Sequence, residues 1–117
     1  MYIFYEYPKC STCRKAKAEL DQLGLDVESI NIKENPPSAQ FLKELLVGSD
    51  LELKKFFNTS GQSYRSLGLK DKLPTLSLDE AVELLASDGM LIKRPILIKD
   101  GKVLQVGYRT PYQDLNL

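Results

Sequence analysis

The sequence predicts an α/β fold in which a small mixed sheet is interrupted by a helical insertion. Three observations predict this class. Residues 2–32 follow the pattern strand, helix, strand; residues 36–88 contain helical segments; and residues 96–106 follow the pattern of a β-hairpin. A chain of 117 residues has the length of one domain. We therefore expect a single domain, with residues 1–33 and 90–117 as its core and residues 36–88 as the insert.

The N-terminal part should form a βαβ unit. A strand at residues 2–5 precedes a helix that begins at about Thr12 and ends before Gly24, a residue suited to the left-handed position after a helix. Residues 27–32 should form the second strand, parallel to the first because a helix connects the two. The apolar face of the helix should carry Cys13, Ala16, Leu20 and Leu23.

The insertion should consist of several short helices. The first should cover residues 39–47, and the last should open at Ser77 with a capping box that Glu80 completes. Helical turns are also expected near residues 51–57 and 64–67, whereas residues 70–72 should form a solvated loop. The side chains expected in the core of this part are Phe41, Leu42, Leu45, Leu46, Phe56, Phe57, Tyr64 and Leu67.

The C-terminal part should contain a hairpin and a short helix. Residues 96–99 and 102–106 flank Asp100-Gly101, a dipeptide that favours a two-residue turn. A short helix is expected near residues 112–115. These strands should complete the sheet that the βαβ unit begins.

The main chemical feature is Cys10-Ser11-Thr12-Cys13, which contains both cysteines of the chain. Two thiols at this spacing can close a disulfide across the first turn of a helix. The first sulfur then lies over the helix N-terminus, where free amides favour the thiolate. A cluster of nearby cations should lower the pKa of the thiol further and attract anionic substrates. The cations are Lys9, Arg14, Lys15 and Lys17. The competing interpretation is a solvated basic face beside two ordinary buried thiols.

Composition excludes several classes of function. The chain has no histidine and no third cysteine, which argues against a structural zinc site and against Ser-His-Asp or Cys-His catalysis. We expect no metal and no resident cofactor. The zero formal charge argues against nonspecific binding of nucleic acid. The N-terminus has no signal-peptide pattern and no apolar run reaches membrane-spanning length, so a cytoplasmic location is expected.

Further motifs along the chain carry a family resemblance. They are an X-Pro before the penultimate strand, residues 34–38, 91–96 and 104–108, together with the C-x-x-C after the first strand. With these motifs the chain resembles, over essentially its whole length, the arsenate reductase/Spx branch of the thioredoxin-like fold. The resemblance implies a helical insertion between an N-terminal βαβ unit and a C-terminal hairpin.

The resemblance also implies roles for particular residues. Cys10 matches the nucleophile, Cys13 the second cysteine of Spx-like members, Arg94 an arginine near the nucleophilic sulfur, and Pro95 a proline with a cis peptide bond. Of these residues, Cys10, Cys13 and Arg94 are expected to be catalytic. The residues expected to bind substrate are Lys9, Ser11, Thr12, Arg14 and Pro95.

The chain departs from both branches of the family. Glutaredoxin-linked arsenate reductases lack the second cysteine and use two further arginines, near whose positions this chain has Asn58 and Val106-Gly107. Arg65 and Arg109 lie nearby in the sequence. Spx is a transcriptional regulator that binds the α subunit of RNA polymerase. The sequence of this chain has no basic C-terminal tail like that of Spx.

The sequence therefore favours a monomeric thiol–disulfide oxidoreductase with a redox-active C-x-x-C. Its substrate would be an oxidised small molecule or protein thiol, and an external donor such as glutathione with glutaredoxin, or thioredoxin, would reduce it. One alternative is a glutaredoxin-linked arsenate reductase. The other is a redox-switched regulator that binds RNA polymerase, which the neutral charge and the missing tail make the weaker interpretation.

Overall fold

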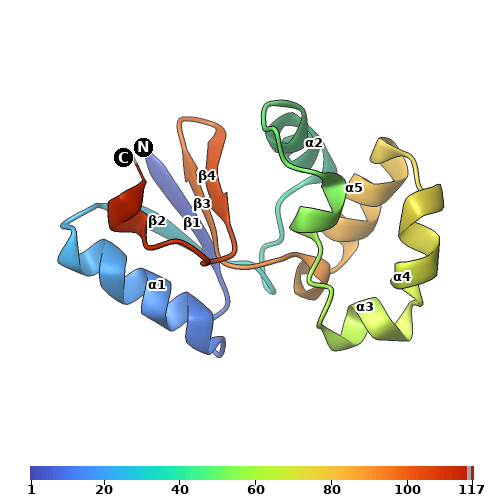
Figure 1. Cartoon of the computed structure of the whole chain (residues 1–117), viewed down its shortest axis with the longest axis horizontal. Coiled ribbons are helices and arrows are strands. Elements are labelled where there is room, and N and C mark those ends of the chain that lie inside the picture. The colour runs from blue at the N-terminus through green and yellow to red at the C-terminus, as the bar shows by residue number, and fades with distance from the viewer. Residues whose placement is uncertain (116) are drawn as a thin grey trace. The chain divides into compact units, whose positions relative to one another are not determined.

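The computed structural model describes residues 1–115 and 117. The chain forms two compact units (Figure 1). The first unit consists of Met1–Asn31 and Arg94–Leu117 and holds the sheet, and the second consists of Ile32–Lys93 and holds the helical insertion. That the whole chain is one domain stays a prediction.

One mixed sheet forms the framework of the first unit. Among the described residues its strands are β1 (Tyr2–Glu6), β2 (Val27–Asn31), β3 (Ile96–Lys99) and β4 (Lys102–Val106), in the spatial order β2-β1-β3-β4. β1 runs parallel to β2 and antiparallel to β3, and β3 runs antiparallel to β4. The predicted βαβ unit is confirmed, because β1 and β2 are parallel and a helix connects them.

That helix, α1 (Ser11–Gln22), ends in the way the sequence predicts. Gly24 has a φ of 69°, its amide donates to the carbonyl of Asp21, and the amide of Leu25 donates to the carbonyl of Leu20. This pattern satisfies carbonyls at the helix end that would otherwise have no partner. The predicted apolar face is correct for Cys13, Ala16 and Leu20. It is wrong for Leu23, which lies at the C-cap, beyond the buried face, and is 40% exposed.

The hairpin between β3 and β4 confirms the turn prediction. Asp100 and Gly101 both have positive φ, 51° and 80°, as a type I′ turn requires. The expected C-terminal helix is a single 3₁₀ turn, η4 (Tyr112–Asp114). It ends before Leu115, whose amide still donates to the carbonyl of Tyr112.

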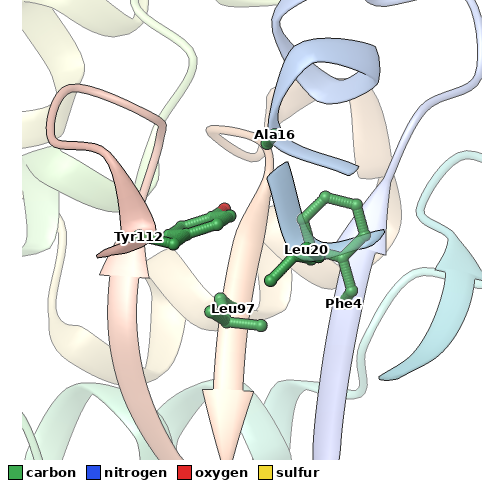
Figure 2. Packing of buried hydrophobic residues seen from close by; sticks show 5 residues of the cluster. All are labelled: Phe4, Ala16, Leu20, Leu97 and Tyr112. Carbon is green, nitrogen blue, oxygen red and sulfur yellow. The ribbon is translucent and has the colours of Figure 1, made fainter. Parts of the chain in front are cut away.

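α1 and η4 share one apolar cluster with the sheet of this unit. Figure 2 shows its members, Phe4 of β1, Leu97 of β3, Ala16 and Leu20 of α1, and Tyr112 of η4, all fully buried. Phe4 and Leu97 are cross-strand partners and therefore lie on the same face of the sheet. Burial of a large apolar side chain contributes about 1.5–3 kcal/mol, so this cluster is a main source of stability for the first unit.

Glu19 of α1 ties the C-terminal segment to the helix. Its carboxylate accepts hydrogen bonds from the Tyr108 hydroxyl at 2.5 Å, the Tyr112 amide at 2.6 Å and the Gln113 amide at 3.1 Å. Burial would raise the pKa of Glu19, but these bonds outweigh it and lower the pKa. The charged form of Glu19 therefore holds Tyr112 in place.

We expect Glu19→Gln to destabilise the protein at neutral pH by about 1 kcal/mol, since the amide cannot accept all these bonds and the site is partly exposed to solvent. The folded protein lowers this pKa, so the stabilisation is present above the ordinary value of 4.5 and is lost as the pH falls through the lowered value. Urea unfolding at several pH values should show the gap to the unmodified protein closing in acid. Asp21→Asn, on the same helix, is the control and should change stability little, because the Lys17–Asp21 pair is exposed.

The second unit is helical. Its elements are α2 (Ala39–Val47), η1 (Leu53–Phe56), α3 (Gln62–Ser66), α4 (Leu69–Lys72), η2 (Leu73–Thr75), α5 (Leu78–Ser87) and η3 (Gly89–Leu91). The capping box of α5 is confirmed: the Glu80 amide donates to the Ser77 hydroxyl and the Ser77 amide donates to the Glu80 carboxylate. α2 packs against α5, and Lys43 pairs with Asp79 at 2.8 Å.

Three predictions for this unit were wrong. Residues 70–72 belong to α4 rather than to a loop, because Gly68 adopts a φ of 64° and lets a new helix begin at once, with Leu69 buried. Leu67 is 43% exposed because it follows the last turn of α3 as its C-cap. Phe41 is only partly buried, whereas the other predicted core residues of this unit are buried.

The helices found in the described part of the chain include none that is both long enough and apolar enough to cross a membrane.

Candidate active site around Cys10 and Cys13

Cys10 is the N-cap residue of α1. Its extended backbone places the thiol over the first turn, where the sulfur accepts a hydrogen bond from the Cys13 amide at 3.4 Å. The loop before it is fixed by the Cys10 amide, which donates to the Tyr7 carbonyl at 2.9 Å. Both cysteines are free thiols; Cys10 is partly exposed and Cys13 is fully buried. A reagent can therefore reach Cys10 first.

The site lowers the pKa of Cys10. Burial raises this pKa, but hydrogen bonds from the Cys13 amide, the Cys13 thiol and the Thr12 amide, together with the charge of Arg94, outweigh it. These donors favour the thiolate, which is the reactive form of cysteine.

The four cations close in sequence do not produce this effect. Arg14 donates to the Pro8 carbonyl at 3.0 Å, and Lys17 pairs with Asp21 at 2.9 Å. Lys9 and Lys15 are exposed. The expectation that this cluster lowers the pKa is therefore corrected: the cation that contributes is Arg94, from the other end of the chain.

Cys13 has the opposite environment. Its side chain is fully buried, and this burial raises its pKa to about 12. The nearby Cys10 contributes to this rise, whereas a hydrogen bond with the Tyr7 backbone and the charge of Arg94 oppose it. The two thiols of one motif thus differ: the accessible thiol has a lowered pKa and the buried thiol has a raised pKa.

Arg94 and Pro95 lie directly before β3. The peptide bond between them is cis, as predicted. The Arg94 guanidinium lies over the Tyr7 ring, 5.4 Å from its centroid, an arrangement that favours a cation. Among the described residues, Nε and Nη1 of Arg94 are buried and have no hydrogen-bond partner. Buried donors without a partner are unusual in folded proteins, which makes Arg94 a candidate for holding an anionic group at this site.

The other predicted site residues lie at the surface of the same loop and helix start. The exposed residues are Lys9, Ser11, Thr12 and Arg14. Their role in binding substrate stays a prediction. Tyr108 does not serve the cysteines directly, because its hydroxyl donates to Glu19. Within the described part of the chain, His, Cys, Asp and Glu form no group of three or more that could hold a metal.

Sequence reasoning did not find the parts that Tyr7, Glu19 and Tyr112 play. Tyr7 supplies both a ring for Arg94 and backbone contacts for the two cysteines. Glu19 and Tyr112 give no local signal, because their partners lie far away in the chain. The separation between Glu19 and Tyr108 is 89 residues.

The lowered pKa of Cys10 predicts a specific pH dependence of alkylation. Iodoacetamide should modify Cys10 with a midpoint below the ~8.5 of an unperturbed cysteine. Arg94→Gln should move the midpoint upward, because the arginine charge favours the thiolate. The measurement is alkylation rate against pH in a Cys13→Ser background, followed by mass spectrometry. A midpoint that stays at the free value in the unmodified site would contradict the nucleophile assignment, and Lys15→Ala is the control expected to leave the midpoint in place.

A C-x-x-C at the N-terminus of α1, a cis proline before β3 and the strand order β2-β1-β3-β4 together define a thioredoxin-like fold. Comparison with known proteins assigns the chain to one family with this fold. The model of the ArsC family matches residues 5–112, and the chain belongs to this family.

The similar proteins are described as having different functions or none. The "Uncharacterized protein YusI" of Bacillus subtilis is 58% identical over 106 residues, covering 91% of this chain and 89% of that protein. A solved structure described as a possible arsenate reductase from Streptococcus mutans is 70% identical, with a TM-score of 0.95, covering 97% of this chain and 96% of that one. The "Global transcriptional regulator Spx" of Lactiplantibacillus plantarum is 33% identical, covering 92% of this chain and 80% of that protein.

Proposed function

We propose that this protein is a thiol–disulfide oxidoreductase of the ArsC family, acting on an oxidised small molecule or an oxidised protein thiol. The observation that carries the proposal is the contrast between the two cysteines. Cys10 is accessible with a lowered pKa, and Cys13 is buried with a pKa raised to about 12. This contrast suits an attacking thiol and a resolving thiol, because each is needed in a different step.

In the first step the Cys10 thiolate attacks one sulfur of the substrate disulfide. A bond forms between Cys10 and that sulfur, and the substrate's own S–S bond breaks, so the other substrate sulfur leaves with the electron pair. The Cys13 amide, 3.4 Å from the Cys10 sulfur, stabilises the thiolate before attack. Arg94 has buried N–H groups free to hold an anionic group of the substrate or the leaving thiolate.

In the second step Cys13 attacks Cys10. The Cys10–Cys13 bond forms, the bond from Cys10 to the substrate breaks, and the released substrate sulfur takes up the proton that Cys13 gives up. Two electrons have then passed from the protein to the substrate. We infer that an external thiol donor, such as glutathione with glutaredoxin, or thioredoxin, returns these electrons by reducing the disulfide. A cytoplasmic setting, which keeps such donors reduced, fits this cycle.

The experiment that tests the proposal is trapping of mixed disulfides. Cys13→Ser should leave the first step intact and block the second, so substrates stay attached to Cys10 and can be identified by mass spectrometry after capture from cells. Cys10→Ser is the matched control and should capture none of them. Equal capture by the two variants, or none by either, would contradict the proposal.

The relatives support two other candidates. The structure from Streptococcus mutans, described as a possible arsenate reductase, and the free N–H groups of Arg94 favour reduction of arsenate. The relationship to Spx favours a redox-switched regulator that binds RNA polymerase, in which Cys10 and Cys13 would act as a switch without turnover. Polymerase subunits captured independently of Cys10 would promote this second candidate.

A further inference from the structure

The helical unit contains a pocket that the cysteine chemistry does not use. Its volume is about 290 Å³, and its walls come from η1 with the residue before it, α3, α4 and η2, all within the second unit (Figure 1). This volume is close to the lower end of the ~300–1,000 Å³ that is typical of small-molecule sites. The pocket therefore has room for a small ligand.

Part of the pocket wall is apolar and fixed. The apolar and aromatic residues that line it are Leu53, Tyr64, Leu73 and Pro74. Tyr64 and Leu73 are only 5% and 8% exposed, and the Tyr64 ring packs edge-on against Phe57 with the ring centroids 6.3 Å apart. Because packing already holds this wall in place, an apolar group bound against it leaves water without the protein having to order new side chains.

The charged residues of the pocket favour an anion. They are Glu52, Lys54 and Lys70, all exposed, and the two lysines come from different elements, η1 and α4. Within the described part of the chain, neither lysine side chain forms an ion pair or a hydrogen bond. Two ammonium groups without a partner thus stand against one carboxylate at the same pocket.

The sequence around the pocket adds to this positive charge. Residues 52–75 contain five cations and two acids, whereas the whole chain has a formal charge of zero. The five cations are Lys54, Lys55, Arg65, Lys70 and Lys72. A local excess of one charge attracts ligands of the opposite charge even when the protein as a whole is neutral.

We propose that this pocket binds a small organic acid, with its apolar body against Tyr64 and Leu73 and its carboxylate held by Lys54 and Lys70. The proposal goes beyond the proposed function and does not depend on it, since both cysteines belong to the other unit. A carboxylate accepts charge-assisted hydrogen bonds from ammonium groups. Exposed ion pairs contribute little by themselves, so the ligand needs the apolar body as well.

The experiment is a titration of the reduced, ¹⁵N-labelled full-length protein with phenylacetate, followed by NMR shifts of the backbone amides. The shifts should saturate with a dissociation constant of about 1 mM or lower and should centre on Leu53, Lys54, Tyr64 and Lys70. Acetate carries the charge without the apolar body, and phenylacetamide carries the ring without the charge. Each should bind at least about fivefold more weakly than phenylacetate.

Two double variants test whether the pocket lysines hold the carboxylate. Lys54→Gln with Lys70→Gln should weaken phenylacetate binding at least about fivefold. Lys55→Gln with Lys72→Gln is the matched control, because it removes the same charge from η1 and α4 at exposed positions that do not line the pocket. This control should change the dissociation constant by less than about twofold.

Each other outcome counts against the proposal. Shifts that do not saturate, or that centre outside the pocket, overturn it, and a protein partner would then be the occupant to test. Equal binding of acetate or of phenylacetamide shows that charge and apolar wall do not act together, and overturns it as well. Equal weakening by the two double variants would mean that the whole positive segment attracts the anion without a defined site.

Discussion

Replacing Cys10 with serine is expected to lower thiol–disulfide turnover by at least about 10³-fold, the scale of loss when a nucleophile is removed. A serine hydroxyl does not ionise near neutral pH, and the donors that lower the pKa of Cys10 cannot make it do so. Cys13 cannot take over, because it is fully buried and its pKa is raised to about 12. The measurement is single-turnover reduction of a small aromatic disulfide by the reduced protein.

Cys13→Ser is the matched control for this prediction. It removes one thiol from the same helical turn, yet it should keep the rate of the first step close to that of the unmodified protein and stop at a stable mixed disulfide. If Cys10→Ser retained turnover while Cys13→Ser lost it, the roles of the two cysteines would be reversed. A normal unfolding curve for both variants shows that the fold is intact.

The elements that the sequence predicts well depend on neighbouring residues. Gly24 ends α1, Asp100-Gly101 makes the hairpin turn, and Ser77 with Glu80 opens α5, in each case because the local backbone requires that residue type. The boundaries of short helices, and which of their residues are buried, are harder to predict from neighbouring residues. The predictions for Leu67 and residues 70–72 were wrong because Leu67 follows α3 as its C-cap and a positive φ at Gly68 lets α4 begin directly afterwards.

In the candidate site, too, local effects could be predicted from the sequence and long-range contacts could not. The motif itself places Cys10 over the helix N-terminus, which is a local effect, and the structure agrees. The prediction that cations near Cys10 in the sequence lower its pKa was wrong. Lys9 and Lys15 are exposed, and Arg14 contacts the Pro8 carbonyl. The charge that acts on the sulfur comes from Arg94, which only the packing of β1 beside β3 brings near. Tyr112 reaches the buried face of α1 by the same kind of long-range contact.

Arsenate reduction is expected to be weak or absent in this protein, although a relative is described as a possible arsenate reductase. Arsenate carries several charged oxygens, and its covalent adduct with a thiol must be held by fixed donors, a task that suits the planar fork of arginine. Arg94 is one such donor, with Nε and Nη1 buried and unpaired among the described residues. The resemblance to glutaredoxin-linked reductases places the further arginines near Asn58 and Val106-Gly107.

These positions do not replace the missing donors of arsenate reductases. Asn58 carries no charge, Val106 is apolar, and the Gly107 amide already donates to the Pro95 carbonyl at 2.8 Å. Each lost donor costs about 10²–10³ in rate in comparable oxyanion sites. The deciding assay is steady-state arsenate reduction with glutaredoxin or thioredoxin as donor, with disulfide exchange by the same preparation as the control for an active site. Efficient arsenate turnover that survives Cys13→Ser would favour an arsenate reductase over the proposed thiol–disulfide oxidoreductase, since the second cysteine would then be unnecessary. In that case Arg109→Gln and Arg65→Gln would identify the arginine that supplies the missing charge.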